Sequence, residues 1–330
     1  MELANAKLVA FGSTRRAGIT PQQDANLAAL LGTDTSAVAI FGKSWDFHVT
    51  EVIHTTLEEN LSMIYDSVSY MKEKGREVIF DAEHFFDGYK ANPDYAMRSL
   101  EAAAEAGADW LVLCDTNGGA FPTEIYQIVK EAAARFAPVP IGIHCHNDGG
   151  MAVANSIIAV EQGAVQVQGT INGYGERCGN ANLCTIIPNL QLKYGLSCVP
   201  QEKIAELTSM SRYISELANM APNERDPYIG NCAFAHKGGM HIDAILKNPA
   251  SFEHITPETV GNERRILMSE VAGRSTILNK IQKVVPGVTK SSPETQKLID
   301  ELKRLEHEGY QFEGAESSFE LMIRRALGKD

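Results

Sequence analysis

Two histidines separated by one residue follow a short apolar run. Residues 141–143 read Ile-Gly-Ile, His144 and His146 come next, and two glycines precede a predicted helix. Because side chains alternate between the two faces of a strand, the two imidazoles are expected to point the same way. Histidine is the commonest protein ligand for metals, although the same pair also occurs as hydrogen-bonded core histidines. The spacing leaves two alternatives open, a divalent metal site and a structural pair.

Polar side chains follow other predicted strands in the same way. Asp81 and Glu83 end one apolar run and share a face by the same alternation. A carboxyl group aimed into an enclosed site acquires a raised pKa and can act as an acid or base, but it can equally be the ion-pair partner of a Lys or Arg. Thr116 could bind a substrate carboxylate or cap a turn. Asn180 could give an oxygen to a metal or be only a turn residue.

Several charged or basic positions are weaker candidates. His48 ends the polar loop after the second predicted strand and could contact substrate. Glu176 and Arg177 are expected to form an ion pair within their own loop. The adjacent Arg15 and Arg16 could meet phosphates, but such pairs are usually solvated surface charges, which is the expectation for them.

The elements that must position these residues alternate regularly. Six apolar runs begin near residues 8, 37, 78, 110, 141 and 165, and each is followed by polar residues and, in most cases, by a helical pattern, the longest at 51–74. Strand–loop–helix repeats predict a parallel sheet with helical crossovers. The polar residues gather after the strands, as in a (β/α)8 barrel, whose active site lies at the carboxyl ends of the strands. No Gly-x-Gly-x-x-Gly turn supports a doubly wound sheet instead.

The predicted fold is therefore an α/β TIM barrel that is incomplete at its N-terminal end, with six of its eight strand–helix units. We expect this catalytic domain over residues 1–196. From about residue 197 the pattern changes to helices without intervening strands. A mainly helical linker or lid region is expected over residues 197–330.

Composition excludes several classes of protein. The chain has 330 residues with 44% hydrophobic content, enough for a large core, and its net charge of −12 argues against a nucleic-acid partner. No apolar run approaches the length of a membrane span, and the first residues lack a signal-peptide pattern. Six scattered cysteines without a Cys-x-x-Cys pair are typical of reduced intracellular thiols. We expect a cytoplasmic protein.

Two long segments resemble a known family. Residues 144–156 read His-Cys-His-Asn-Asp-Gly-Gly-Met-Ala-Val-Ala-Asn-Ser, and residues 169–180 read Gly-Thr-Ile-Asn-Gly-Tyr-Gly-Glu-Arg-Cys-Gly-Asn. Together they resemble the paired signatures of the 2-isopropylmalate synthase, homocitrate synthase and citramalate synthase family. The resemblance extends over nearly the whole chain, and residues 11–16, 42–48 and 81–89 look most like the citramalate synthase branch.

The resemblance implies a Claisen-type condensation of acetyl-CoA with a 2-oxo acid. For the citramalate synthase branch the oxo acid is pyruvate, and the product is (R)-citramalate for isoleucine biosynthesis. The resemblance also implies that a divalent metal (Zn, Mn, Co or Mg) is held by His144, His146 and Asn180. The metal would polarise the oxo acid's carbonyl and orient it for attack.

The same resemblance assigns roles to other residues. Glu83 matches a carboxylate near the reacting acetyl group, and Thr116 matches a contact to the substrate carboxylate. Asp81 and His48 are taken as further substrate contacts. His241 matches a histidine that the second region supplies to the active site, often across a dimer, so we expect a homodimer.

The chain also departs from the family pattern. Members begin with a strand carrying Asp-Thr-Thr-Leu-Arg-Asp-Gly, which supplies another metal ligand and a catalytic arginine, and residues 1–12 contain no match to it. Members under feedback control carry a C-terminal regulatory domain as well. We therefore expect this chain alone to be inactive or nearly so. The alternatives are 2-isopropylmalate or homocitrate synthesis and, from another class, a non-catalytic metal-binding barrel remnant that acts as an interaction protein.

Overall fold

The computed structural model describes residues 3, 5–237 and 239–267 and, in the C-terminal part, residues 278, 281–282, 289, 291–310 and 315–326. The chain divides into two units, Met1–Ile186 and Ile187–Asp330. The first unit carries the strand–helix alternation and the second carries the predicted linker region.

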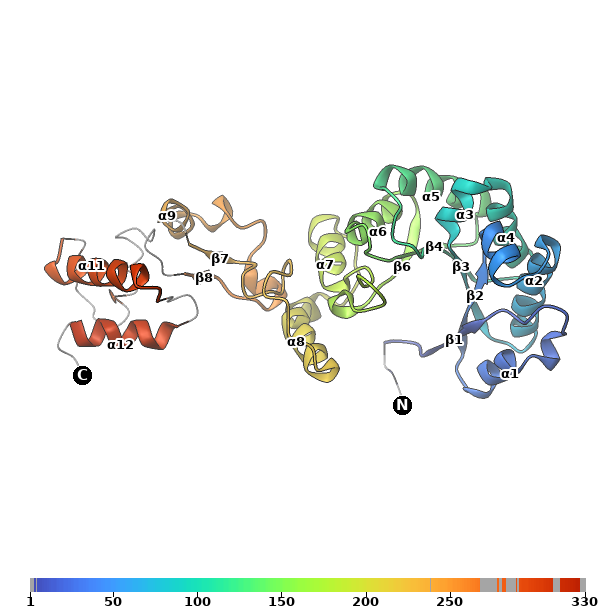
Figure 1. Ribbon diagram of the computed structural model, residues 1–330, viewed down its shortest axis with the longest axis horizontal. Helices are drawn as coiled ribbons and strands as arrows, with labels where there is room; N and C mark the ends of the chain where they lie inside the picture. The colour runs from blue at the N-terminus through green and yellow to red at the C-terminus, as the bar shows by residue number, and fades with distance from the viewer. Residues whose placement is uncertain are drawn as a thin grey trace. The chain divides into compact units, whose positions relative to one another are not determined.

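A curved parallel sheet forms the centre of the first unit (Figure 1). Its strands lie side by side in the order in which they occur along the chain. This is the arrangement of consecutive units of a (β/α)8 barrel, so the six predicted strand–helix units are confirmed. The strands are β1 (Val9–Ser13), β2 (Ala37–Lys43), β3 (Glu77–Glu83), β4 (Trp110–Asp115), β5 (Ile141–Cys145) and β6 (Ala164–Gln168).

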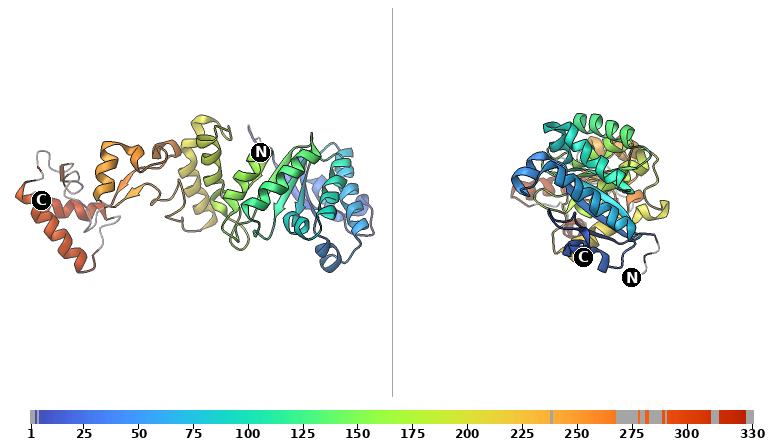
Figure 2. Two further views of the ribbon diagram at one scale, coloured as in Figure 1. Left: turned by 90° about the horizontal axis from the view of Figure 1, so that it is seen from above. Right: turned by 90° about the vertical axis from the view of Figure 1, so that its right-hand side faces the viewer.

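Helices cover the outer, convex side of this sheet (Figures 1 and 2). Each turns one apolar stripe inward; α2, for example, buries Met63, Ile64, Val68 and Met71. Burying a side chain of this size stabilises the fold by about 1.5–3 kcal/mol. The strand side chains that point away from the helices form the inner face of the sheet. The helices are α1 (Ala25–Gly32), α2 (Leu57–Glu73), α3 (Phe85–Ala91), α4 (Pro93–Glu105), α5 (Pro122–Phe136), α6 (Ala152–Glu161) and α7 (Leu183–Pro188).

The helix predicted over residues 51–74 begins later than expected. A separate turn occupies His48–Val52, and His54 takes a left-handed conformation with φ 51°. Helix α2 then begins at Leu57, because the Thr56 hydroxyl accepts a hydrogen bond from the N–H of Glu59 and caps the first turn. The apolar spacing continues across this cap, so periodicity alone could not locate the break.

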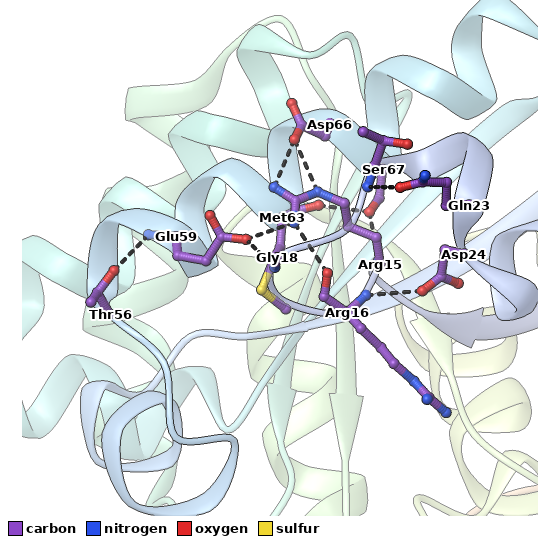
Figure 3. A network of polar contacts seen from close by, with 11 residues as sticks. Arg15, Arg16, Gly18, Gln23, Asp24, Thr56, Glu59, Met63, Asp66 and Ser67 are labelled. Carbon is purple, nitrogen blue, oxygen red and sulfur yellow. Dashed lines mark hydrogen bonds and ion pairs between the residues drawn. The ribbon is translucent and has the colours of Figure 1, made fainter.

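The prediction that Arg15 is a solvated surface charge is wrong. Its side chain is only 6% exposed and donates to Asp66 Oδ2 from Nε at 2.9 Å and from Nη2 at 2.7 Å. Its Nη1 donates to Glu59 Oε1 at 2.7 Å. Figure 3 shows this network around Arg15, and the exposed side chain of Arg16 points away from it. Arg15 therefore fastens the loop after β1 to helix α2, while Arg16 meets solvent.

Replacing Arg15 with methionine is expected to lower the free energy of unfolding by about 2–3 kcal/mol. This is less than the ~3–5 kcal/mol for breaking a fully buried pair, because Glu59 and Asp66 keep 32% and 41% of their side-chain surface exposed. Urea denaturation measures the change. Arg16→Met is the matched control and is expected to shift stability by no more than ~0.5 kcal/mol. Equal losses in both variants would contradict the assignment.

The second unit is mainly helical, as predicted, but it also contains a strand pair. Ala235–His236 (β7) and Arg265–Ile266 (β8) pair in parallel. The prediction that this region has no strands is therefore wrong. A strand of two residues is too short to show the alternation of apolar and polar residues by which strands are recognised in a sequence. The segment that carries His241 forms a helix. The longer helices are α8 (Leu207–Ala218), α9 (Gly239–Lys247), α11 (Pro293–His307) and α12 (Glu316–Ala326).

Membrane-spanning helices are absent from the part of the chain that the structure describes, where no helix combines the length and apolar character that crossing a bilayer requires.

Candidate active site

A cavity of about 1210 Å³ lies against the inner face of the sheet in the first unit. The strand alternation explains its lining, because residues of one face recur at every second position. The cavity brings together all the predicted site residues except His48 and His241. These lining residues are Asp81, Glu83, Thr116, His144, His146 and Asn180.

The two histidines lie next to each other at the end of β5. Their ring centroids are 5.0 Å apart. His146 forms a backbone bridge with Asn180, which brings the loop after β6 against the end of β5. The Asn180 Nδ2 donates to the Tyr174 carbonyl at 3.0 Å, whereas its Oδ1 is buried without a hydrogen-bond partner. Two imidazoles and one amide oxygen therefore meet at the cavity.

This donor set fits a divalent metal. Burial is the largest cause that lowers the pKa of both His144 and His146, and the neighbouring His144 lowers that of His146 further. Neutral imidazole is the form that binds metals. A buried oxygen without a partner is costly, so Asn180 Oδ1 gains from a ligand role. Among the residues that the structure describes, no cluster of three or more His, Cys, Asp or Glu could hold a metal. The fit thus rests on two histidines and an amide.

A hydrogen-bonded chain connects Asp81 to His144 through Gln168. Gln168 Nε2 donates to Asp81 Oδ1 at 3.0 Å, and Gln168 Oε1 lies 2.9 Å from His144 Nδ1. Asp81 is 6% exposed, and this burial raises the pKa of its carboxyl to about 7. Gln168 was not among the predicted site residues. Its signal is the alternation Val-Gln-Val-Gln at residues 165–168, which directs two amides to one face of a largely apolar strand.

Glu83 and Thr116 are both anchored by other residues of the strand ends. Lys43, from β2, forms an ion pair with Glu83, which was the alternative left open for this carboxylate. The Thr116 hydroxyl accepts a hydrogen bond from the backbone N–H of His84 at 2.9 Å. Its own proton remains available to donate into the cavity.

Arg177 makes contacts beyond its predicted ion pair with Glu176. It donates to both oxygens of Asp148, at 2.7 and 2.8 Å, and to the Thr116 carbonyl at 2.8 Å. The predicted pair with Glu176 is present at 3.7 Å, but Asp148 is the closer partner. Arg177 Nη2 also lies 3.3 Å from His146 Nδ1, so the arginine borders the histidine pair.

His48 and His241 lie outside the residues that line this cavity. His48 packs in an aromatic cluster, with ring centroids 5.1 Å from Trp45 and 4.1 Å from His84. His241 belongs to the second unit, where its ring stacks on Phe252 at 4.2 Å. The functional roles of both residues stay predictions.

Comparisons with known proteins identify the family of this chain. The HMGL-like family matches residues 4–214, and a second family, the homocitrate synthase post-HMGL domain-like family, matches residues 228–310. Among solved structures, the HMG-CoA lyase of Bacillus subtilis superimposes with a TM-score of 0.55 at 21% identity, covering 68% of this chain and 74% of the lyase. That likeness shows the TIM-barrel fold alone. The chain belongs to the HMGL-like family.

Within the family, the chain is more similar to an (R)-citramalate synthase than to a probable 2-isopropylmalate synthase. It is 56% identical over 328 residues to the (R)-citramalate synthase of Aquifex aeolicus. Its identity to a probable 2-isopropylmalate synthase of Methanopyrus kandleri is 35% over 285 residues, covering 86% of this chain and 55% of that protein. The match to the Aquifex protein covers 99% of this chain but 62% of the relative. The chain thus spans less than two thirds of the length of that relative.

Proposed function

We propose that this chain carries the catalytic domain of an enzyme that condenses acetyl-CoA with pyruvate and hydrolyses the thioester of the adduct with water, which gives (R)-citramalate and CoA. The observation that supports this most is the cavity at the strand ends, where His144, His146 and Asn180 converge beside Asp81 and Glu83. The identity of 56% to an (R)-citramalate synthase, against 35% to a probable 2-isopropylmalate synthase, favours pyruvate over larger oxo acids.

In this proposal His144, His146 and Asn180 hold a divalent metal, with Zn, Mn, Co and Mg as candidates. When bound, the metal supplies Lewis-acid polarisation of the oxo acid's carbonyl. The Thr116 hydroxyl, which already accepts from His84 N–H, donates its proton to the substrate carboxylate. This contact fixes the orientation of the oxo acid.

The two carboxyl groups differ in their surroundings and so in their proposed roles. Burial raises the pKa of Asp81 to about 7, so this carboxyl can take up or release a proton near neutral pH. Lys43 fixes the carboxylate of Glu83 at the cavity wall, where we place the acetyl group. Removal of the acetyl methyl proton requires a base in this region. A catalytic role of His241 and a homodimer stay predictions. A cytoplasmic location stays a prediction.

The proposal predicts a ranking of substrates. We expect the protein that contains residues 1–330, purified at its natural length, to release CoA from acetyl-CoA fastest with pyruvate. The comparison substrates are 3-methyl-2-oxobutanoate and 2-oxoglutarate, and free thiol is measured with and without a chelator. A higher kcat/KM for either larger acid would replace citramalate synthesis with 2-isopropylmalate or homocitrate synthesis. Turnover without acetyl-CoA would favour carbon–carbon bond cleavage instead.

A further inference from the structure

We infer that Gln168 is a positioning residue that presets His144 for metal binding, an inference that rests on the proposed metal site. The side-chain amide of Gln168 bridges Asp81 and His144, with contacts of 3.0 and 2.9 Å. Through these contacts it holds a proton on Nδ1 of His144 and leaves the lone pair on Nε2 for the metal.

The direction of the bridge follows from the partners at its two ends. Gln168 Nε2 faces Asp81 Oδ1, and an amide NH2 only donates, so this oxygen of Asp81 is the acceptor whether the carboxyl is ionised or carries a proton on its other oxygen. The amide oxygen then faces His144, and Nδ1 has to donate to it. With Asp81 ionised, a flipped amide would set an oxygen against the carboxylate and leave two acceptors facing each other in a buried site. Only one tautomer of His144 satisfies the whole chain of hydrogen bonds.

The sheet fixes this bridge in place. His144 and Gln168 are direct partners in the parallel register of β5 and β6, so their side chains start from neighbouring backbone positions. Side chains on strands are held more precisely than side chains on loops. Asp81 lies on β3 and is 6% exposed, so water competes little for its side of the bridge.

The second histidine has a different neighbour. Arg177 Nη2 lies 3.3 Å from His146 Nδ1, and a guanidinium only donates. Nδ1 of His146 is therefore the acceptor in this contact, so His146, unlike His144, has to give up its Nε2 proton or its contact with Arg177 when a metal binds. Of the two candidate ligands, His144 is the one whose neighbour holds the proton on Nδ1, so we expect the loss of Gln168 to weaken metal binding through His144.

Metal affinity of the full 330-residue chain tests the inference without using activity. We expect Gln168→Leu to bind Zn²⁺ or Co²⁺ about 10–100-fold more weakly than the unmodified chain, as is typical for the loss of a partner behind a ligating histidine. Titration calorimetry on metal-free protein measures this. Gln166→Leu is the matched control, because Gln166 lies two residues earlier on β6 and its Oε1 is buried without a partner. We expect Gln166→Leu to leave the affinity within about threefold.

Exchanging the carboxylate at position 81 with the amide at position 168 distinguishes a positioning role of Gln168 from a packing role. In the double variant Asp81→Asn/Gln168→Glu, the new carboxylate accepts from His144 Nδ1 and the new amide donates to that carboxylate. We expect this pair to recover the affinity to within about tenfold of the unmodified chain. Affinity as weak as that of Gln168→Leu, or no loss in Gln168→Leu itself, would overturn the inference. Failure of the unmodified chain to bind metal at all would instead overturn the proposed site.

The tautomer can also be read directly in the unmodified chain. Long-range ¹H–¹⁵N correlation spectra of the metal-free protein, with labelled histidine, distinguish a protonated nitrogen from an unprotonated one. We expect His144 to be protonated on Nδ1 and unprotonated on Nε2, and Gln168→Leu to remove this preference. The opposite tautomer in the unmodified chain would overturn the inference, and this readout does not depend on the folding of any variant.

Discussion

Replacing His144 with alanine is expected to weaken divalent-metal binding by at least ~100-fold. The variant loses a proposed ligand, which should cost more than the 10–100-fold typical of an outer-shell partner. His144 is also the histidine that β5 and Gln168 hold most firmly, through strand register and the hydrogen bond at Nδ1. His146 and Asn180, which remain, cannot fill three ligand positions. Calorimetry on chelator-treated protein measures the affinity, and elemental analysis measures the metal retained after purification.

Thermal unfolding supplies an independent readout of the same prediction. A metal that binds only the folded chain stabilises it by about 2.7 kcal/mol at a concentration 100 times Kd. We expect added metal to raise the Tm of the unmodified chain and to leave that of His144→Ala unchanged. His307→Ala is the control, since His307 lies exposed at the end of α11. An unaltered metal content in His144→Ala would rule out the site.

Replacing Asp81 with asparagine is expected to stabilise the metal-free chain at alkaline pH. Burial raises the pKa of Asp81 from 3.8 to about 7. A carboxyl whose folded-state pKa is raised contributes stability that is fully present below its unfolded pKa and is lost as pH rises toward 7. Asparagine carries no charge and avoids this loss. At about 1.4 kcal/mol per pKa unit, the gain at pH 8 is of the order of 2–4 kcal/mol.

The pH dependence distinguishes this effect from a general gain in packing. The difference between Asp81→Asn and the unmodified chain should be small near pH 4, grow up to about pH 7 and level off above it. Urea denaturation in the presence of a chelator, at several pH values, measures the difference. Asp34→Asn removes the same charge from an exposed position and is the matched control. A constant difference at all pH values would show that the ionisation of Asp81 is not the cause.

The sequence allowed the strand-based part of the site to be predicted. Alternation along β3 and β5 was enough to pair Asp81 with Glu83 and His144 with His146, and the parallel order of the strands brings their carboxyl ends to one rim. All four residues line the same cavity. These predictions rest on regular geometry, in which the direction of a side chain follows from its position along the strand.

Other features could not be predicted because they depend on long-range partners. Nothing near Arg15 in the sequence indicates that Glu59 and Asp66, more than 40 residues away, will surround it. The bridge made by Gln168 joins residues 24 and 87 positions away. The break before α2 depends on one capping hydroxyl, that of Thr56. Periodicity describes repeated contacts, whereas each of these is a single contact set by the tertiary fold.

The most direct test of the account is anomalous diffraction from crystals of this chain grown with Zn²⁺ or Co²⁺. We predict one strong anomalous peak at the strand ends, within about 2.0–2.2 Å of a nitrogen of both His144 and His146 and beside Asn180 Oδ1. Such a peak would establish the metal centre on which the proposed condensation depends. A fully occupied metal bound elsewhere, with none between the two histidines, would contradict the account.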